Sequence, residues 1–135
     1  AHASDLNCDF SRPCCWSNVG PPRDELDWVQ ATSLPNDQKF QNVFGSVQKP
    51  NTPYLISSSD AAASSVYAIL NSCILPCQAD TGTLSFKKWT SPQVNLDVCT
   101  LPIGSDSYNF CQTVTETGPD VSVPIPPQNG PFQVR

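Results

Sequence analysis

The sequence has no methionine, a single histidine and few charged side chains. Charged residues make up only 14% of its 135 residues, and the seven cations are scattered along the chain. Phosphate binding requires grouped lysines and arginines that release counterions, so nucleic acid is not an expected partner. The one histidine, His2, lies near the N-terminus. Its position argues against Ser-His and Cys-His catalysis and against multi-histidine metal sites.

Long apolar segments are also missing. The longest runs from Val66 to Leu70, far short of the roughly 20 residues that a membrane-spanning helix needs. We therefore expect no membrane insertion by this segment. Proline, in contrast, accounts for 14 residues, about twice its usual share. Because proline removes a donor and clashes inside helices, the chain is not expected to be mostly helical.

Seven cysteines in an acidic chain rich in proline, serine and threonine predict disulfide bonds and an oxidising compartment. A zinc site and largely free thiols are the alternatives, but the spacing lacks paired C-x-x-C knuckles. Local pairing predicts bonds from Cys8 to Cys14 or Cys15, from Cys73 to Cys77 and from Cys99 to Cys111. One cysteine is left over, and we assign Cys15 to this role, as a free thiol or an intermolecular partner.

Alternation of apolar and polar residues with period two predicts short strands separated by turns. The predicted strands cover residues 54–56, 66–70, 83–86, 94–98, 121–125 and 132–134. Pro124 confines its strand to an edge or a bulge. The prolines that follow it predict a crossover between strands rather than a polyproline ligand. Residues 57–65 are interpreted as a loop, with one helical turn as the alternative, and the whole pattern predicts an antiparallel sandwich or barrel.

An unusual group of residues lies in the N-terminal third: Cys8-Asp9-Phe10, Cys14-Cys15-Trp16 and Asp24-Glu25-Leu26-Asp27-Trp28. It resembles the opening of a MAM domain, the extracellular module of meprins, neuropilins and some receptor tyrosine phosphatases. That family opens with Cys-Asp-Phe-Glu, continues to Cys-x-Trp and then has an acidic stretch ending in Asp-Trp. Beyond residue 30 the similarity is mainly one of patterning. The chain departs from the family at Ser11, which replaces glutamate, and at the extra Cys15.

The resemblance implies an all-β fold, a disulfide-stabilised jelly-roll antiparallel β-sandwich over residues 8–135 that lacks its final strand or strands. Residues 1–7 are expected to be a flexible N-terminal end or a cloning remnant. The implied function is that of an extracellular, non-catalytic adhesion or recognition module, which binds another extracellular protein or itself. The expected fold-determining residues are Phe10, Trp16, Asp27 and Trp28.

Two other functions fit the sequence. One is a carbohydrate-binding accessory domain, because jelly rolls also host lectins. Its candidate aromatic platforms are Tyr54, Trp89, Tyr108 and Phe110. The other is a structural or pro-region domain of a larger extracellular protein, with no ligand of its own.

No catalytic residue or cofactor is assigned. The carboxylates of Asp24, Glu25 and Asp27 follow a Pro-Pro turn, and nothing in the sequence raises the pKa of one of them as glycosidase chemistry requires. A G-x-S-x-G nucleophile motif is absent. Structural calcium is considered, since Asp9, Asp24 and Asp27 would converge if the first strand lay against the Asp-Trp segment, but no ligand is assigned.

Overall fold

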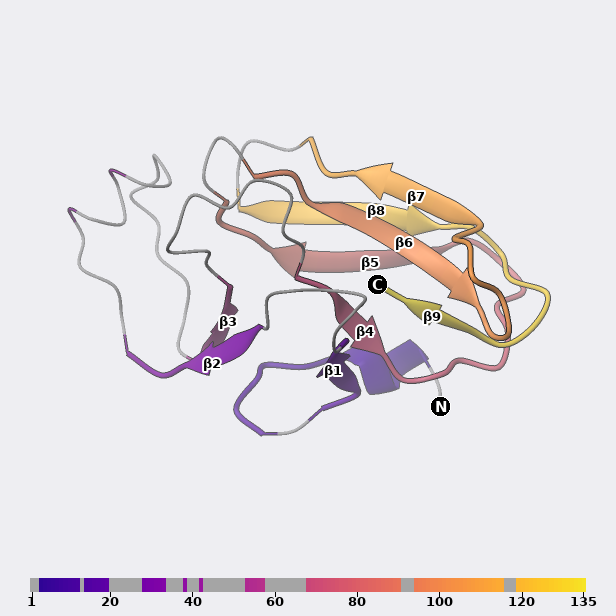
Figure 1. Cartoon of the computed structure of the whole chain (residues 1–135), viewed down its shortest axis with the longest axis horizontal. Coiled ribbons are helices and arrows are strands. Elements are labelled where there is room, and N and C mark those ends of the chain that lie inside the picture. Colours follow the sequence, from indigo (N-terminus) through magenta and orange to yellow (C-terminus); the bar gives the residue numbers. More distant parts are fainter. Residues whose placement is uncertain are drawn as a thin grey trace.

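The computed structural model describes residues 3–12, 14–19, 28–33, 38, 42, 53–57, 68–90, 94–115 and 119–135. Within these residues the architecture is all-β and antiparallel (Figure 1). A 3-10 helix, η1 (Ala3–Leu6), precedes nine strands: β1 (Trp16–Asn18), β2 (Val29–Ala31), β3 (Tyr54–Ile56), β4 (Leu70–Ser72), β5 (Gly82–Lys87), β6 (Asp97–Pro102), β7 (Phe110–Thr113), β8 (Asp120–Ile125) and β9 (Phe132–Val134).

Strands β5 and β8 form a two-stranded sheet with one apolar and one polar face. Leu84 lies opposite Val123 on the apolar face, and Ser85 lies opposite Ser122 on the polar face, with 3.3 Å between the two hydroxyl oxygens. Val123 is fully buried, whereas Ser122 is exposed. The strict alternation follows from the two-residue period of a strand with one face on a core and the other in water.

Proline within β8 is tolerated because of its place in this ladder. The backbone N–H of Lys88 donates to the carbonyl of Pro119 at 2.9 Å. Hydrogen-bonded and non-hydrogen-bonded pairs alternate along antiparallel strands. Pro124, opposite Thr83, therefore falls at a non-hydrogen-bonded position, where its missing N–H costs no bond to β5.

A second sheet has the order β7-β6-β9. Its central strand, β6, is buried without interruption from Val98 to Leu101. A strand that is covered on both faces loses the alternation of a half-exposed strand. For this reason the prediction of an alternating strand over 94–98 is only partly right: β6 begins at Asp97, and Val94 is 55% exposed.

The apolar face of β8 packs against the second sheet, which gives a sandwich-like arrangement with one core (Figure 1). The buried members of this core are Leu75, Val98, Val121, Val123, Ile125, Phe132 and Val134. Phe132 is its largest fully buried side chain. The predicted strands at 54–56, 83–86, 121–125 and 132–134 are confirmed, as is the crossover between β8 and β9. Residues 58–67 lie outside the described residues; they include nearly all of the loop interpreted at 57–65 and the first two residues of the strand predicted at 66–70. Of that predicted strand, Leu70 belongs to β4.

Polar groups inside the sandwich are hydrogen-bonded to one another. The fully buried Thr100 donates its hydroxyl to the Asn109 side-chain oxygen. Asn109 in turn donates to the Gln128 side-chain oxygen at 2.9 Å, and Gln128 is 5% exposed. Because the buried side chains of Thr100 and Gln128 both have a partner, neither leaves a desolvated polar atom unpaired.

The N-terminal segment contacts the sandwich rather than remaining separate from it. Leu6, at the end of η1, is partly buried against the core. The prediction that residues 1–7 form a flexible N-terminal end remains a prediction. Strand β1 pairs with β4, and the buried Ser72 of β4 accepts the backbone N–H of Val134 in β9 at 2.9 Å. β4 thus connects the N-terminal segment to the second sheet.

Three disulfide bonds crosslink this arrangement: Cys8–Cys14, Cys15–Cys73 and Cys99–Cys111, while Cys77 is a free and exposed thiol. The bonds Cys8–Cys14 and Cys99–Cys111 agree with the prediction. The predicted Cys73–Cys77 bond and the predicted unpaired Cys15 are wrong.

Strand register explains both errors. Trp16 of β1 lies opposite Ser72 of β4, so the next pair of residues outward is Cys15 and Cys73. The backbone N–H of Cys73 donates to the Cys15 carbonyl at 2.7 Å, and the two Cα atoms lie 5.1 Å apart. This bond joins residues separated by 58 positions, a pairing that local spacing does not reveal.

Candidate functional site

The Cys8–Cys14 disulfide closes a short loop that presents Phe10. Its two Cα atoms lie 6.0 Å apart. Inside the loop the Asp9 carboxylate accepts the Ser11 hydroxyl at 2.6 Å and the Ser11 backbone N–H at 3.0 Å. These bonds to the ionised form lower the pKa of Asp9 from its ordinary value, and the nearby Arg12 charge lowers it further. They form the side-chain-capped turn that aspartate favours.

Phe10 adopts a left-handed backbone conformation, with φ of 62°. This region is sterically unfavourable for a residue with a bulky side chain. The conformation is held from outside the loop, since the Gln30 side-chain amide of β2 donates to the Phe10 carbonyl. The loop and Gln30 therefore hold the Phe10 backbone in a strained conformation.

Two tryptophans complete the aromatic part of the site. The Trp16 indole N–H donates to the Leu6 carbonyl at 2.8 Å, and the Trp28 indole N–H donates to the Ala68 carbonyl at 3.3 Å. Asn18 holds the Trp28 backbone on both sides, accepting its N–H at 2.7 Å and donating to its carbonyl at 2.9 Å. Each indole is thus oriented by a hydrogen bond, as partly buried tryptophans require.

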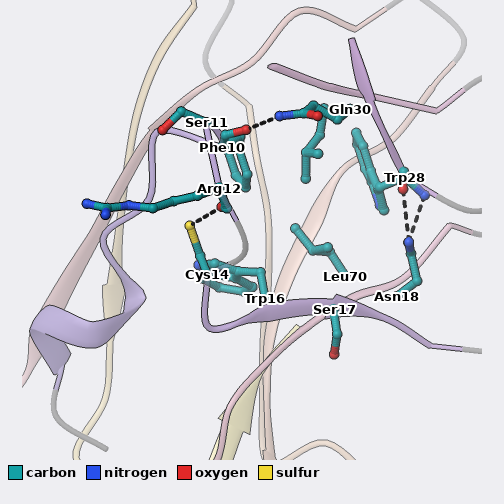
Figure 2. Close-up of a pocket in the computed structure, with 11 residues that line it drawn as sticks. Phe10, Ser11, Arg12, Cys14, Trp16, Ser17, Asn18, Trp28, Gln30 and Leu70 are labelled. Carbon is teal, nitrogen blue, oxygen red and sulfur yellow. Dashed lines mark hydrogen bonds between the residues drawn. The ribbon is translucent and has the colours of Figure 1, made fainter. Parts of the chain in front are cut away.

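These aromatic rings line a pocket of about 300 Å³ (Figure 2). Figure 2 shows Phe10, Trp28, Leu70 and Trp16 around one central space, with Gln30 at its edge. The β2–β3 ribbon contributes Gln30 and Leu55, which lie opposite each other in the ribbon register. The full lining is Phe10, Ser11, Arg12, Cys14, Trp16, Ser17, Asn18, Trp28, Gln30, Leu55 and Leu70.

Arg12 is the one charged side chain among these lining residues. In Figure 2 it extends outward from the edge of the pocket, away from the central space. It is exposed, and within the described part of the chain its guanidinium forms no ion pair. The pocket therefore combines an apolar interior with one cationic group at its edge.

Three of the four expected fold-determining residues meet in this pocket: Phe10, Trp16 and Trp28. The fourth, Asp27, lies outside the described residues. Sequence reasoning missed Asn18, Gln30, Leu55 and Leu70. These residues carry no motif of their own, and only the pairing of β2 with β3 and of β1 with β4 brings them to the site.

The other candidate sites are not assembled in the described part of the chain. Asp24, Glu25 and Asp27 fall outside it, and no group of three metal-ligating side chains occurs within it. The expected sugar-platform residues are not gathered in one place: Tyr54 lies on β3 and donates its hydroxyl to the Ser33 carbonyl at 3.1 Å, Trp89 follows β5, and Phe110 packs against the core. Tyr108 is 42% exposed, between β6 and β7. Among the described helices, none is long and apolar enough to cross a bilayer.

Comparison of the chain with family models, curated proteins and solved structures found no match.

Proposed function

We propose that the chain is an extracellular, non-catalytic recognition module. It binds another extracellular protein, or a second copy of itself, through the pocket formed by Phe10, Trp16 and Trp28. We also propose that its sandwich is a divergent jelly roll of the MAM type. The three disulfides support an oxidising compartment.

One observation carries this proposal: Phe10 is kept at φ of 62° by a disulfide-closed loop and by Gln30, with its ring in an aromatic pocket. Strained residues persist where the surrounding structure over-determines them, and such positions cluster at binding sites. Aromatic residues and arginine are also the residue types that dominate binding energy at protein interfaces. Among the described residues that line the pocket, Arg12 alone carries a charge, and such a cation beside aromatic rings is typical of protein interfaces.

Binding of sugar is less well supported by the same pocket. Sugar hydroxyls need free hydrogen-bonding groups beside an aromatic face. Here both indole N–H groups are committed to backbone carbonyls, and Asn18 uses both of its polar atoms on the Trp28 backbone.

The proposal is tested by measuring the binding of a multivalent form of the chain to a panel of purified extracellular domains and to a glycan array. Sedimentation velocity at rising concentration tests self-association in parallel. The pocket variant is Phe10→Asn, because asparagine tolerates the left-handed conformation. The control is Val29→Thr, since Val29 alternates with Gln30 on β2 and lies on the other face of the ribbon.

We expect binding to a protein, or to the chain itself, that Phe10→Asn abolishes and Val29→Thr retains. Binding confined to glycans would favour the carbohydrate-binding alternative. Protein binding that survives Phe10→Asn, or no binding to any protein, would contradict the proposal.

A further inference from the structure

We propose that the pocket receives an aromatic or large aliphatic side chain of the partner protein, with a carboxylate of the same partner beside it that contacts Arg12. This inference rests on the proposed function and specifies the chemistry of the partner.

The first step is the interior of the pocket. Its central space lies between Phe10, Trp16, Trp28 and Leu70 (Figure 2). A volume of about 300 Å³ is at the lower end for ligand sites. Such a space suits an inserted side chain better than a long ligand. Burial of the partner's apolar surface against these rings provides the favourable free energy of binding.

The second step is that both indole N–H groups and the Gln30 amide nitrogen beside this space already donate hydrogen bonds within the chain. The Trp16 and Trp28 indoles donate to backbone carbonyls, and the Gln30 amide nitrogen donates to the Phe10 carbonyl. A polar occupant would lose its bonds to water and gain few in return. The part of the partner that enters the pocket is therefore apolar.

The third step is the charge at the edge. Arg12 extends outward beside the pocket mouth, and the carboxylate near it, Asp9, is engaged by Ser11. The chain as a whole carries a net charge of −5, so the cation of Arg12 is a local exception. A carboxylate next to the inserted side chain complements this cation. A basic neighbour would be repelled.

The fourth step is preorganisation. The Phe10 loop is closed by the Cys8–Cys14 bond and tied to β2 through Gln30. A loop that is already ordered loses little conformational freedom on binding, so even a small contact retains affinity. Phe10 and Arg12, two residues apart in this loop, therefore present one apolar and one cationic contact at a fixed spacing.

Titration of the 15N-labelled chain with short peptides tests this inference by NMR. The probes are acetylated and amidated Gly-Glu-Phe-Gly, Gly-Gln-Phe-Gly and Gly-Glu-Ala-Gly. The signals are the indole N–H resonances of Trp16 and Trp28. Trp89 does not line the pocket and serves as an internal reference.

We expect the Glu-Phe peptide to shift the Trp16 and Trp28 signals and not that of Trp89. Replacing glutamate by glutamine should weaken binding about two- to fivefold, the range for an exposed charge pair. Replacing phenylalanine by alanine should weaken it about tenfold or more, because the apolar anchor is lost.

Arg12→Gln is expected to bring the affinities for the Glu-Phe and Gln-Phe peptides to the same value. Lys88→Gln removes an equal charge from a residue that does not line the pocket, and it should leave the preference unchanged. Preference for glutamate that survives Arg12→Gln, or equal affinity of the unaltered chain for both peptides, would overturn the inference.

Two further outcomes separate this inference from the proposed function. If phenylalanine peptides bind regardless of charge, the inference fails while apolar docking in the pocket stands. If 3′-sialyllactose shifts the same indole signals at lower concentration than any peptide, an acidic sugar replaces the protein side chain and the inference fails. A result in which no peptide shifts Trp16 or Trp28 also overturns it, and the protein array then decides the proposed function separately.

Discussion

Phe10 shows how a single residue can combine an unfavourable backbone conformation with a useful position. Its φ of 62° lies in the region that glycine adopts without steric cost, whereas any residue with a Cβ is disfavoured there. Its ring nevertheless lines the pocket. The effect of the backbone conformation on stability can be separated from the effect of the ring by paired substitutions.

Phe10→Ala and Phe10→Gly both remove the ring, and they differ mainly in how easily the backbone adopts the left-handed conformation. We expect the glycine variant to be the more stable of the two by about 1 kcal/mol in the free energy of unfolding, because only glycine relieves the strain. Urea denaturation followed by fluorescence measures both. A more stable alanine variant would show that the left-handed conformation is not present in solution.

The Asp9 carboxylate gives a prediction about pH. Its pKa is lowered from the ordinary value of 3.8, first by the Ser11 hydroxyl and backbone N–H and then by Arg12. Because the folded-state pKa lies below the unfolded one, these interactions stabilise the folded chain above pH 3.8 and are lost as the pH falls through the lower value.

Ser11→Ala is therefore expected to raise the Asp9 pKa toward 3.8. NMR titration of the Asp9 side-chain carboxyl measures this change directly. The matched control is Ser122→Ala, which removes a hydroxyl from the outer face of β8 and leaves the Asp9 loop intact. An Asp9 pKa that does not change in Ser11→Ala would show that the turn does not form in solution.

At the residue scale, the sequence indicated part of the site for a physical reason. Phe10, Trp16 and Trp28 are large aromatics close to one another in the chain, so their burial could be anticipated. Leu55 and Leu70 reach the same pocket only through strand pairing. Their apolar character did not distinguish them from ordinary core residues.

At the scale of single strands, exposure decided which predictions succeeded. β8 has one solvent-exposed face, so the alternation of apolar and polar residues identified both the position of the strand and its buried residues. β6 is covered on both faces, and the run from Val98 to Leu101 gave no periodic signal. β7 was missed because one of its two half-buried positions is occupied by the polar Gln112, so apolar and polar residues do not alternate along it.

The alternation of β8 predicts a sharp contrast between neighbouring positions. Val123→Ala should lower the free energy of unfolding by about 2–3 kcal/mol, because Val123 is fully buried and the lost methyl groups leave a cavity. Ser122→Ala, on the exposed face one residue earlier, should change it by about 0.5 kcal/mol or less. Urea denaturation of the two variants provides the comparison. Equal effects would mean that Val123 and Ser122 do not lie on opposite faces of β8 in solution.

At the scale of the whole molecule, the disulfide pattern joins the pocket to the sandwich. Cys14 and Cys15 are adjacent, yet one bonds to Cys8 within the loop and the other to Cys73, 58 positions away. The sequence indicated that disulfides form but not which cysteines pair, because pairing follows from the register of β1 with β4. Local spacing succeeded for Cys99 and Cys111 because β6 and β7 are close in the chain and place the two residues opposite each other.

Alkylation of the unreduced chain followed by peptide mapping is expected to label Cys77 alone. Partial reduction and fragmentation between Cys14 and Cys15 should then identify bonds to Cys8 and Cys73, respectively. A control alkylation after full reduction should label all seven cysteines. Label on Cys15, or a peptide that joins Cys73 to Cys77, would contradict the pattern.

The β2–β3 ribbon has two faces with separate roles, and this has a practical consequence for protein engineering. Gln30 and Leu55 face the pocket, whereas Val29 and Ile56 form a cross-strand pair on the other side, 55% and 40% exposed. Libraries randomised at the first pair would diversify ligand preference, while threonine at the second pair would reduce unwanted adhesion between molecules during purification. Affinity and colloidal behaviour can thus be optimised independently on the two faces of one two-stranded ribbon.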